Sequence, residues 1–241
     1  MIVKTHFEVG QTALAIVCDD SFHNIVKDAV FEARGMIESK ISEDPFFGIT
    51  FDPYPPSDDD DPLIRRMCQS SEKAGVGPMA GVAGAVAEYA VSAAVGKGCR
   101  HIIVENGGDI AMLTDTETHI GLFAGEKGFE DLALEVAPTG GIYGICSSSG
   151  KIGPSVSFGS SGICTVFSKD TILADCCATA LGNMIITGTK DELAHSAERI
   201  CSVDGVEGCI CVCNGSMSIC GDVPELVRGR FDDGSLTRIV L

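Results

Sequence analysis

Tryptophan is absent from this chain of 241 residues, aromatic residues make up only 6% of it, and basic residues are scarce. Lys and Arg number 17 against 34 Asp and Glu, which gives a formal net charge of -17. Nucleic acids and anionic membrane surfaces attract basic patches, so we expect neither as a partner. The chain is nevertheless 45% hydrophobic, so it can bury a sizeable core of small and aliphatic side chains.

Long apolar runs are missing as well. No segment has eighteen uninterrupted apolar residues, and the first residues lack a basic stretch followed by an apolar one. We therefore expect a cytoplasmic protein with neither a membrane span nor a signal peptide. The sequence leaves open whether copies of the chain form a homo-oligomer.

The twelve cysteines include no Cys-x-x-Cys pair, and the five histidines show no metal-ligand spacing. A reducing cytoplasm argues against a disulfide framework, and buried thiols act as small hydrophobic groups. Cys176 and Cys177 are adjacent on an expected helix. They are either packing groups or weak catalytic candidates, one of them carrying a persulfide if its thiolate is stabilised.

Helical and extended segments intermix without a regular βαβ rhythm, which favours an α+β fold, and we expect a single domain over residues 1–241. Helices are expected at 22–39, 63–73, 79–95, 172–186 and 191–201. Strands are expected at 101–105, 110–113, 119–124, 132–136, 142–146 and 163–167. A hairpin is expected at 208–220, and either a strand or a hairpin at 5–18. A loop rich in Pro and Asp spans 44–62.

One expected helix carries two side chains with oxygen atoms that can bind a metal ion. Asp175 and Thr179 are four residues apart, so their side chains share a helix face. A carboxylate and a hydroxyl in this arrangement suit Mg²⁺, which prefers oxygen ligands. The many Gly and Ala residues of the 79–95 helix predict that another helix, a strand or a ligand approaches its backbone closely.

Two glycine-containing segments follow strands. The Asn-Gly-Gly-Asp sequence at 106–109 is expected to be a tight turn in which Asp109 accepts hydrogen bonds from a sugar or base, although such a sequence is also an ordinary turn. The segment 146–150 offers hydroxyls and backbone amides that can cradle phosphates, unless it is only a flexible surface loop. Its candidate ligands are Ser148, Ser149 and Gly150.

The order of four motifs carries a resemblance. These motifs are Gly-Pro-Met-Ala-Gly-Val-Ala-Gly-Ala-Val-Ala-Glu (77–88), Ile-Val-Glu-Asn-Gly-Gly-Asp-Ile (103–110), Gly-Ile-Cys-Ser-Ser-Ser-Gly (144–150) and Leu-Ala-Asp-Cys-Cys-Ala-Thr-Ala (173–180). Over nearly its whole length the chain resembles the ApbE-like family of archaea and anaerobic bacteria, distant relatives of FAD:protein FMN transferases. The resemblance implies an ApbE-like α+β fold with mixed or antiparallel sheets and packed helices.

The resemblance also implies site residues. Asp175 and Thr179 match the side chains that bind Mg²⁺ beside the FAD pyrophosphate in the transferases, with a backbone carbonyl from the small-residue helix region completing the protein ligands. The residues that match the lining of the flavin site are Gly107, Gly108, Asp109, Ser149 and Gly150.

Two departures from the transferases leave enzymatic activity open. The transferase motif Gly-Ile-Ala-Lys-Gly-Tyr contains a lysine, whereas Val86-Ala87-Glu88 precede Tyr89 here. The interval 153–162 has neither the histidines nor the acid of His-His-Ile-x-Asp-Pro. Three functions remain open. The chain assists anaerobic sulfur assimilation (the incorporation of sulfide into homocysteine) with a protein partner; it transfers FMN from FAD; or it binds a flavin or other nucleotide without chemistry.

Overall fold

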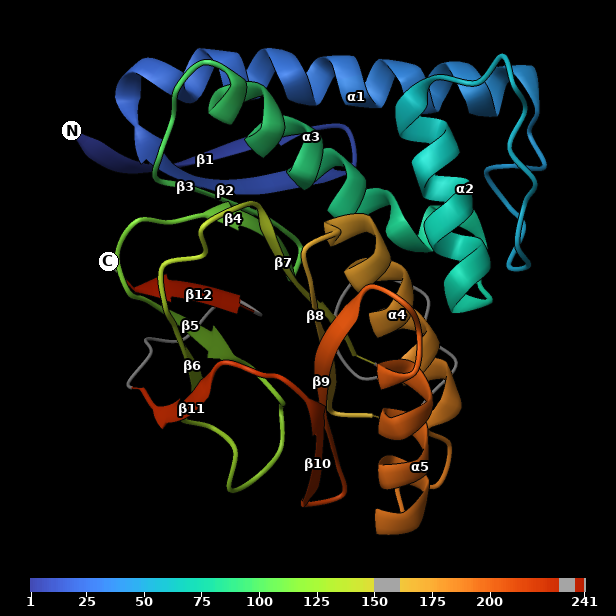
Figure 1. The fold of residues 1–241 in the computed structure, drawn as a ribbon, viewed down its shortest axis with the longest axis vertical. Coiled ribbons are helices and arrows are strands. Elements are labelled where there is room, and N and C mark those ends of the chain that lie inside the picture. The colour runs from blue at the N-terminus through green and yellow to red at the C-terminus, as the bar shows by residue number, and fades with distance from the viewer. Residues whose placement is uncertain (150–160, 230–236, 241) are drawn as a thin grey trace.

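The computed structural model describes residues 1–149, 161–229 and 237–240, with backbone alone for the last four. In these ranges the chain forms five α-helices and two antiparallel sheets (Figure 1). The helices are α1 (His23–Glu43), α2 (Pro62–Ala74), α3 (Val82–Gly96), α4 (Thr171–Met184) and α5 (Lys190–Cys201). Short 3₁₀ turns at Asp20–Phe22 and Pro78–Gly81 lead into α1 and α3.

The larger sheet has eight strands in the order β1-β2-β3-β4-β7-β8-β9-β10. They are β1 (Ile2–Val9), β2 (Thr12–Asp19), β3 (Ile102–Asn106), β4 (Asp109–Leu113), β7 (Tyr143–Ser148), β8 (Ile163–Ser168), β9 (Val206–Cys213) and β10 (Ser216–Gly221). The smaller sheet, in the order β11-β6-β5-β12, contains β5 (Thr118–Leu122), β6 (Leu132–Val136), β11 (Glu225–Arg228) and β12 (Thr237–Val240).

The two faces of the larger sheet belong to two hydrophobic cores. Side chains alternate between the faces of a strand, so Ile102 and Val104 pack with the helices, whereas Ile103 points to the opposite core. That second core also receives Ile120 and Leu134 from the smaller sheet. The helices therefore cover one face of the larger sheet and the smaller sheet lies beyond the other face (Figure 1).

This architecture confirms the α+β fold with antiparallel sheets. The expected helices and strands are present within a few residues of their expected ends. The sequence analysis missed β11 and β12, which have four residues each and lie at the two edges of the smaller sheet. A strand this short has too few alternating positions to show a period of two.

The small residues of α3 and its leading turn face α4, which confirms the expected close approach and identifies the neighbour as a helix. A Cβ atom on Gly81 would lie 2.7 Å from the Cys176 sulfur, and one on Gly84 would lie 2.7 Å from the carbonyl oxygen of Thr171. Backbones this close exclude larger side chains, so glycine at these positions lets α3 seat against α4.

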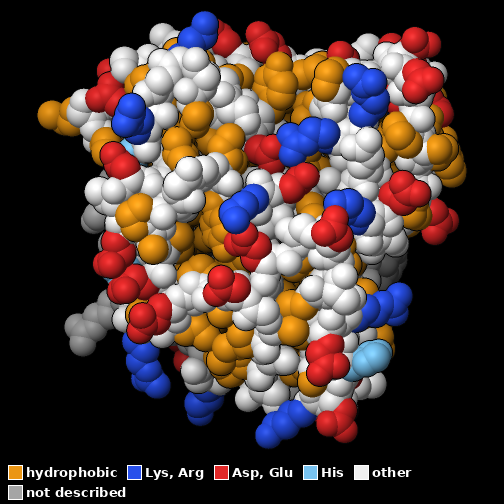
Figure 2. All heavy atoms as spheres, in the orientation of Figure 1, with side chains coloured by type: hydrophobic (Ala, Val, Ile, Leu, Met, Phe, Trp, Pro, Cys, Tyr) orange, Lys and Arg blue, Asp and Glu red, His pale blue; other side chains and the backbone are white. Residues whose placement is uncertain are grey.

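The segment Pro78–Gly96 is, among the described residues, the one helical stretch long and apolar enough by composition to cross a membrane, and half of it is buried. It contacts α1, α4 and the strands β3 and β4. Its apolar composition is therefore accounted for by packing inside the protein. On the molecular face shown in Figure 2, acidic and basic side chains of the described residues are interspersed with apolar ones.

Candidate functional site

The start of α4 is fixed by charged side chains from three helical segments. Asp170 caps the helix, since its carboxylate accepts a 3.0 Å hydrogen bond from the backbone amide of Leu173. Glu88 of α3 accepts a 2.7 Å hydrogen bond from the amide of Thr171. Arg66 of α2 pairs with Glu88 at 2.6 Å and with Asp170 at 3.2 Å. Four otherwise unpaired amides begin every helix, so these carboxylates satisfy donors that need partners.

Asp175 lies one turn further along α4 and is buried against α3. Its carboxylate Oδ2 accepts a 2.8 Å hydrogen bond from the backbone amide of Gly84. Burial raises the pKa of Asp175 well above its usual value, and the neighbouring charge of Asp109 raises it further. Thr179, one more turn along the helix, is half-buried. The shared helix face predicted for Asp175 and Thr179 is thus present in α4.

The Asn-Gly-Gly-Asp turn brings Asp109 to the same region. Gly107 and Gly108 both have positive φ, 67° and 112°, which a two-residue hairpin between antiparallel strands requires. Asp109 then begins β4, where its Oδ1 accepts a 3.2 Å hydrogen bond from the amide of Ser147 on β7. Burial raises the pKa of Asp109 to about 7.

The donors gathered here fit a hard divalent cation. Asp109 and Asp175 are buried close enough for their charges to interact, and no cationic side chain of the described residues pairs with either. The hydroxyl of Ser148 on β7 is also buried and has no hydrogen-bond partner in the described chain. Carboxylates and a hydroxyl are ligands that Mg²⁺ prefers, and the charge of a bound cation would favour the ionised carboxylates that burial alone disfavours.

The neighbouring backbone is held as well. Asn106 precedes the glycine turn, and its side-chain amide donates a 3.2 Å hydrogen bond to the carbonyl of Ala83, directly before Gly84. Ser149 donates a 2.7 Å hydrogen bond to the carbonyl of Gly162. Gly150, the last predicted ligand of the serine loop, lies outside the described residues, as does the rest of that loop up to residue 160.

The adjacent thiols of α4 lie in the hydrophobic core. Cys176 and Cys177 are fully buried, and burial raises the pKa of both thiols. Full burial also closes both thiols to solvent, so these surroundings support the packing alternative. Half-buried thiols occur instead at Cys201 and Cys220, and the Cys201 sulfur lies 3.7 Å from that of Cys209. The sequence spacing of Cys201, Cys209 and Cys220 does not predict that these thiols lie close together, because only the fold of the chain brings them together.

The fold is that of the flavin transferases named ApbE. The structure matches the apo form of the Pseudomonas stutzeri flavinyl transferase ApbE with a TM-score of 0.58 and 12% identity, covering 91% of this chain and 95% of that one. It matches the flavin transferase ApbE from Vibrio cholerae with a TM-score of 0.57 and 12% identity, covering 91% and 96%. At this identity the similarity establishes the fold alone.

Sequence comparison identifies the family. A family model described as "AbpE bacteria" matches residues 3–217, and the chain belongs to this family. The UPF0280 protein of Methanothrix thermoacetophila is 41% identical over 239 residues, which covers 98% of this chain and 100% of the relative. The UPF0280 protein of Methanosarcina acetivorans is 35% identical over 237 residues, covering 98% and 93%. The expected ApbE-like membership is confirmed.

Proposed function

We propose that the chain binds a flavin nucleotide, FAD or FMN, together with a divalent cation such as Mg²⁺, at a site altered relative to that of the transferases. The observation that carries this proposal is the pair of buried carboxylates, Asp109 and Asp175, without a cationic partner in the described chain. The ApbE fold supports the ligand class, since proteins of this fold include flavin transferases.

Each site residue has a role in this proposal. Asp109 and Asp175 hold the cation, with the hydroxyl of Thr179 as a further oxygen ligand. Bound Mg²⁺ would supply positive charge to neutralise a pyrophosphate. The hydroxyl of Ser148 and the backbone amides of the Gly107–Gly108 turn are donors for the nucleotide. The amide of Gly84 keeps Asp175 oriented through its 2.8 Å hydrogen bond.

The test is a titration with FAD in the presence and absence of Mg²⁺. We expect wild-type protein to quench flavin fluorescence and to melt at a higher temperature with FAD and Mg²⁺, because a ligand that binds only the folded state stabilises it. The Asp175→Asn variant should weaken Mg²⁺-dependent binding at least tenfold. Asp191→Asn, which changes an exposed carboxylate on α5, should bind as the wild type does. An unchanged melting temperature at saturating FAD and Mg²⁺ contradicts the proposal.

FMN transfer is the second candidate function, and one observation makes it less well supported than nucleotide binding. The residues before Tyr89, Val86-Ala87-Glu88, lack the lysine of the transferase motif, and Glu88 is occupied by Arg66 and by the start of α4. Incubation with FAD, Mg²⁺ and an acceptor flavoprotein distinguishes the two. Covalent flavin on the acceptor would establish transfer; binding without covalent flavin, beside an active transferase as control, would leave the nucleotide-binding role.

We further propose that the protein assists anaerobic sulfur assimilation, the role that the ApbE-like resemblance implies. The half-buried thiols of Cys201 and Cys220 support it as places where sulfur can be carried. Anaerobic incubation with polysulfide, whose sulfane sulfur passes to a thiolate without net oxidation, should add one sulfur to Cys201 or Cys220. Intact mass and peptide mapping detect the addition. An unmodified mass under these conditions contradicts a carrier role.

A further inference from the structure

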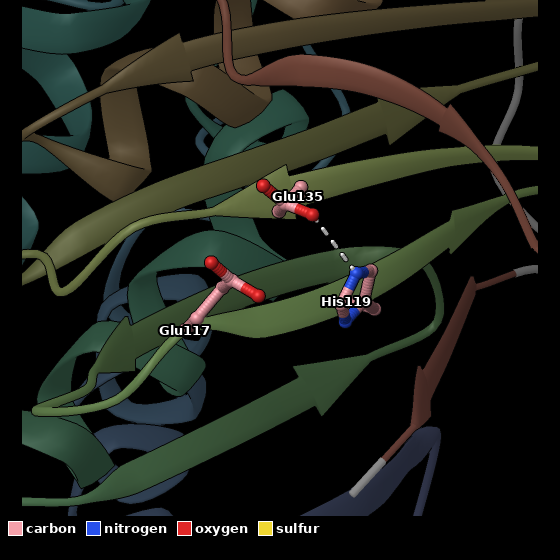
Figure 3. Close-up of side chains that lie close together, drawn as sticks. All are labelled: Glu117, His119 and Glu135. Atoms are coloured by element: carbon pink, nitrogen blue, oxygen red, sulfur yellow. Dashed lines mark ion pairs between the residues drawn. The ribbon is translucent and has the colours of Figure 1, made fainter.

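A second group of metal-ligating side chains lies on the smaller sheet, far from the helices. His119 of β5 and Glu135 of β6 are directly opposite each other in the antiparallel register. Glu117 precedes His119 by two residues, so it falls on the same side of the chain. Figure 3 shows the three side chains turned toward one another, with His119 Nε2 at 3.3 Å from a carboxylate oxygen of Glu135. One ligand atom from each residue lies within 4.8 Å of the others.

The carboxylates around this group favour a bound cation. Glu225 of β11 lies opposite Glu135 on its other side, so two glutamates are cross-strand neighbours. Like charges in this position destabilise a sheet. Among the described residues, the one ion pair that involves these three glutamates is that of Glu135 with His119. Two glutamates therefore share one row of the sheet with His119, and Glu117 adds a third carboxylate two residues along the chain.

We propose that Glu117, His119 and Glu135 bind Zn²⁺. An imidazole nitrogen with carboxylate oxygens is a donor set that zinc accepts, and the imidazole favours a transition metal over Mg²⁺ or Ca²⁺. The side chains of His119 and Glu135 are 43% and 34% exposed, so the ion can enter from solvent. Three protein ligands leave a further position for water.

This zinc site is separate from the proposed flavin site in place and in chemistry. His119 and Glu135 belong to the smaller sheet, whereas Asp109 and Asp175 lie between the larger sheet and its helices. Bound zinc would cross-link β5 to β6 and offset the repulsion between Glu135 and Glu225. The consequence is a smaller sheet whose stability depends on the metal even when no nucleotide is bound.

Calorimetric titration of metal-free protein with Zn²⁺ tests the assignment. We expect one equivalent to bind wild-type protein and to raise its melting temperature. Glu117→Gln and His119→Ala should each weaken this equivalent at least tenfold. His195→Ala removes an exposed histidine on α5 and should change neither affinity nor stoichiometry. Glu117 precedes β5, so its substitution leaves the strand pairing intact and gives a second reading if His119→Ala fails to fold.

Cobalt substitution separates this site from the thiols. Co²⁺ bound by nitrogen and oxygen gives visible ligand-field absorption without the intense near-ultraviolet band of thiolate coordination. We expect the thiolate-free spectrum, and its loss in Glu117→Gln. Identical Zn²⁺ affinities in wild type, Glu117→Gln and His119→Ala would overturn the proposal, as would a thiolate spectrum for the single bound equivalent.

Discussion

The carboxylate of Glu88 accepts a 2.7 Å hydrogen bond from the backbone amide of Thr171, and so joins the middle of α3 to the first turn of α4. Its second oxygen pairs with Arg66 of α2 at 2.6 Å. A residue that departs from the transferase motif thus holds three helices together. The same contact sets the start of the helix that presents Asp175, which links the altered motif to the candidate site.

Replacing Glu88 by Gln should lower the free energy of unfolding by about 1–3 kcal/mol, because a buried charged hydrogen bond and its ion pair are lost. Urea denaturation measures the change. Glu72→Gln, which alters an exposed carboxylate on α2, serves as the control and should lie within about 0.5 kcal/mol of wild type. Equal unfolding midpoints for the two variants would mean that Glu88 does not hold the helices.

Gly84→Ala should also destabilise the protein, although alanine is the better helix former. The new Cβ would lie 2.7 Å from the carbonyl oxygen of Thr171 and 2.9 Å from the Cβ of Asp175. Crowding of this kind costs about 1–3 kcal/mol. At Gly96, by contrast, a Cβ meets no atom within 4 Å, so Gly96→Ala should be neutral or stabilise by up to about 1 kcal/mol. The melting temperatures of both variants compare the cost of crowding with the gain in helix propensity. A Gly84→Ala variant that melts above wild type would refute the close packing of α3 against α4.

Local chemistry explains which parts of the site were predictable from sequence. The four-residue spacing of Asp175 and Thr179 is a property of one helix, and the Asn-Gly-Gly-Asp turn depends on positive φ at Gly107 and Gly108. Both were predicted because neighbouring residues determine them. The charge coupling of Asp109 to Asp175 was not, since these residues come from different elements and meet only when α4 packs on the larger sheet.

The zinc ligands show the same limit more sharply. His119 and Glu135 have no metal-ligand spacing, and only the register between β5 and β6 sets them opposite each other. Glu225 joins the row through β11, a four-residue edge strand too short to be predicted from its sequence pattern. The thiols of Cys201 and Cys209 likewise approach to 3.7 Å through the packing of α5 on β9. Tertiary pairing, which a single sequence does not contain, determines all three relationships.

Thiol labelling of the folded protein should modify Cys201 and Cys220 well before Cys176 and Cys177. The first two are half-buried and the second two are fully buried. Burial raises the pKa of Cys201 to about 11, so its labelling should accelerate as the pH rises. Timed reaction with iodoacetamide and peptide mass mapping gives the order. Urea-unfolded protein is the control in which all four label alike; labelling of Cys176 or Cys177 as fast as Cys220 in the folded protein would contradict the packing role.

The buried carboxyl group of Glu105 on β3 should make stability depend on pH. Burial raises its pKa to about 7, whereas the unfolded chain has the ordinary value near 4.5. Between these values the folded protein keeps a proton that the unfolded chain has lost. The free energy of unfolding therefore falls as the pH rises from about 4.5 to about 7, by about 3 kcal/mol for this group at most.

Glu105→Gln removes the titrating carboxyl group. The free energy of unfolding of this variant should therefore exceed that of wild type only slightly at pH 5, and by about 3 kcal/mol at pH 8. Urea denaturation across this range measures the difference. The contributions of the other carboxyl groups cancel in it, because these groups titrate in both proteins. Glu72→Gln changes an exposed group and should run parallel to wild type at every pH. Because only a proton held at Glu105 makes the difference grow with pH, a constant offset between Glu105→Gln and wild type would show that this carboxyl group is ionised throughout the range.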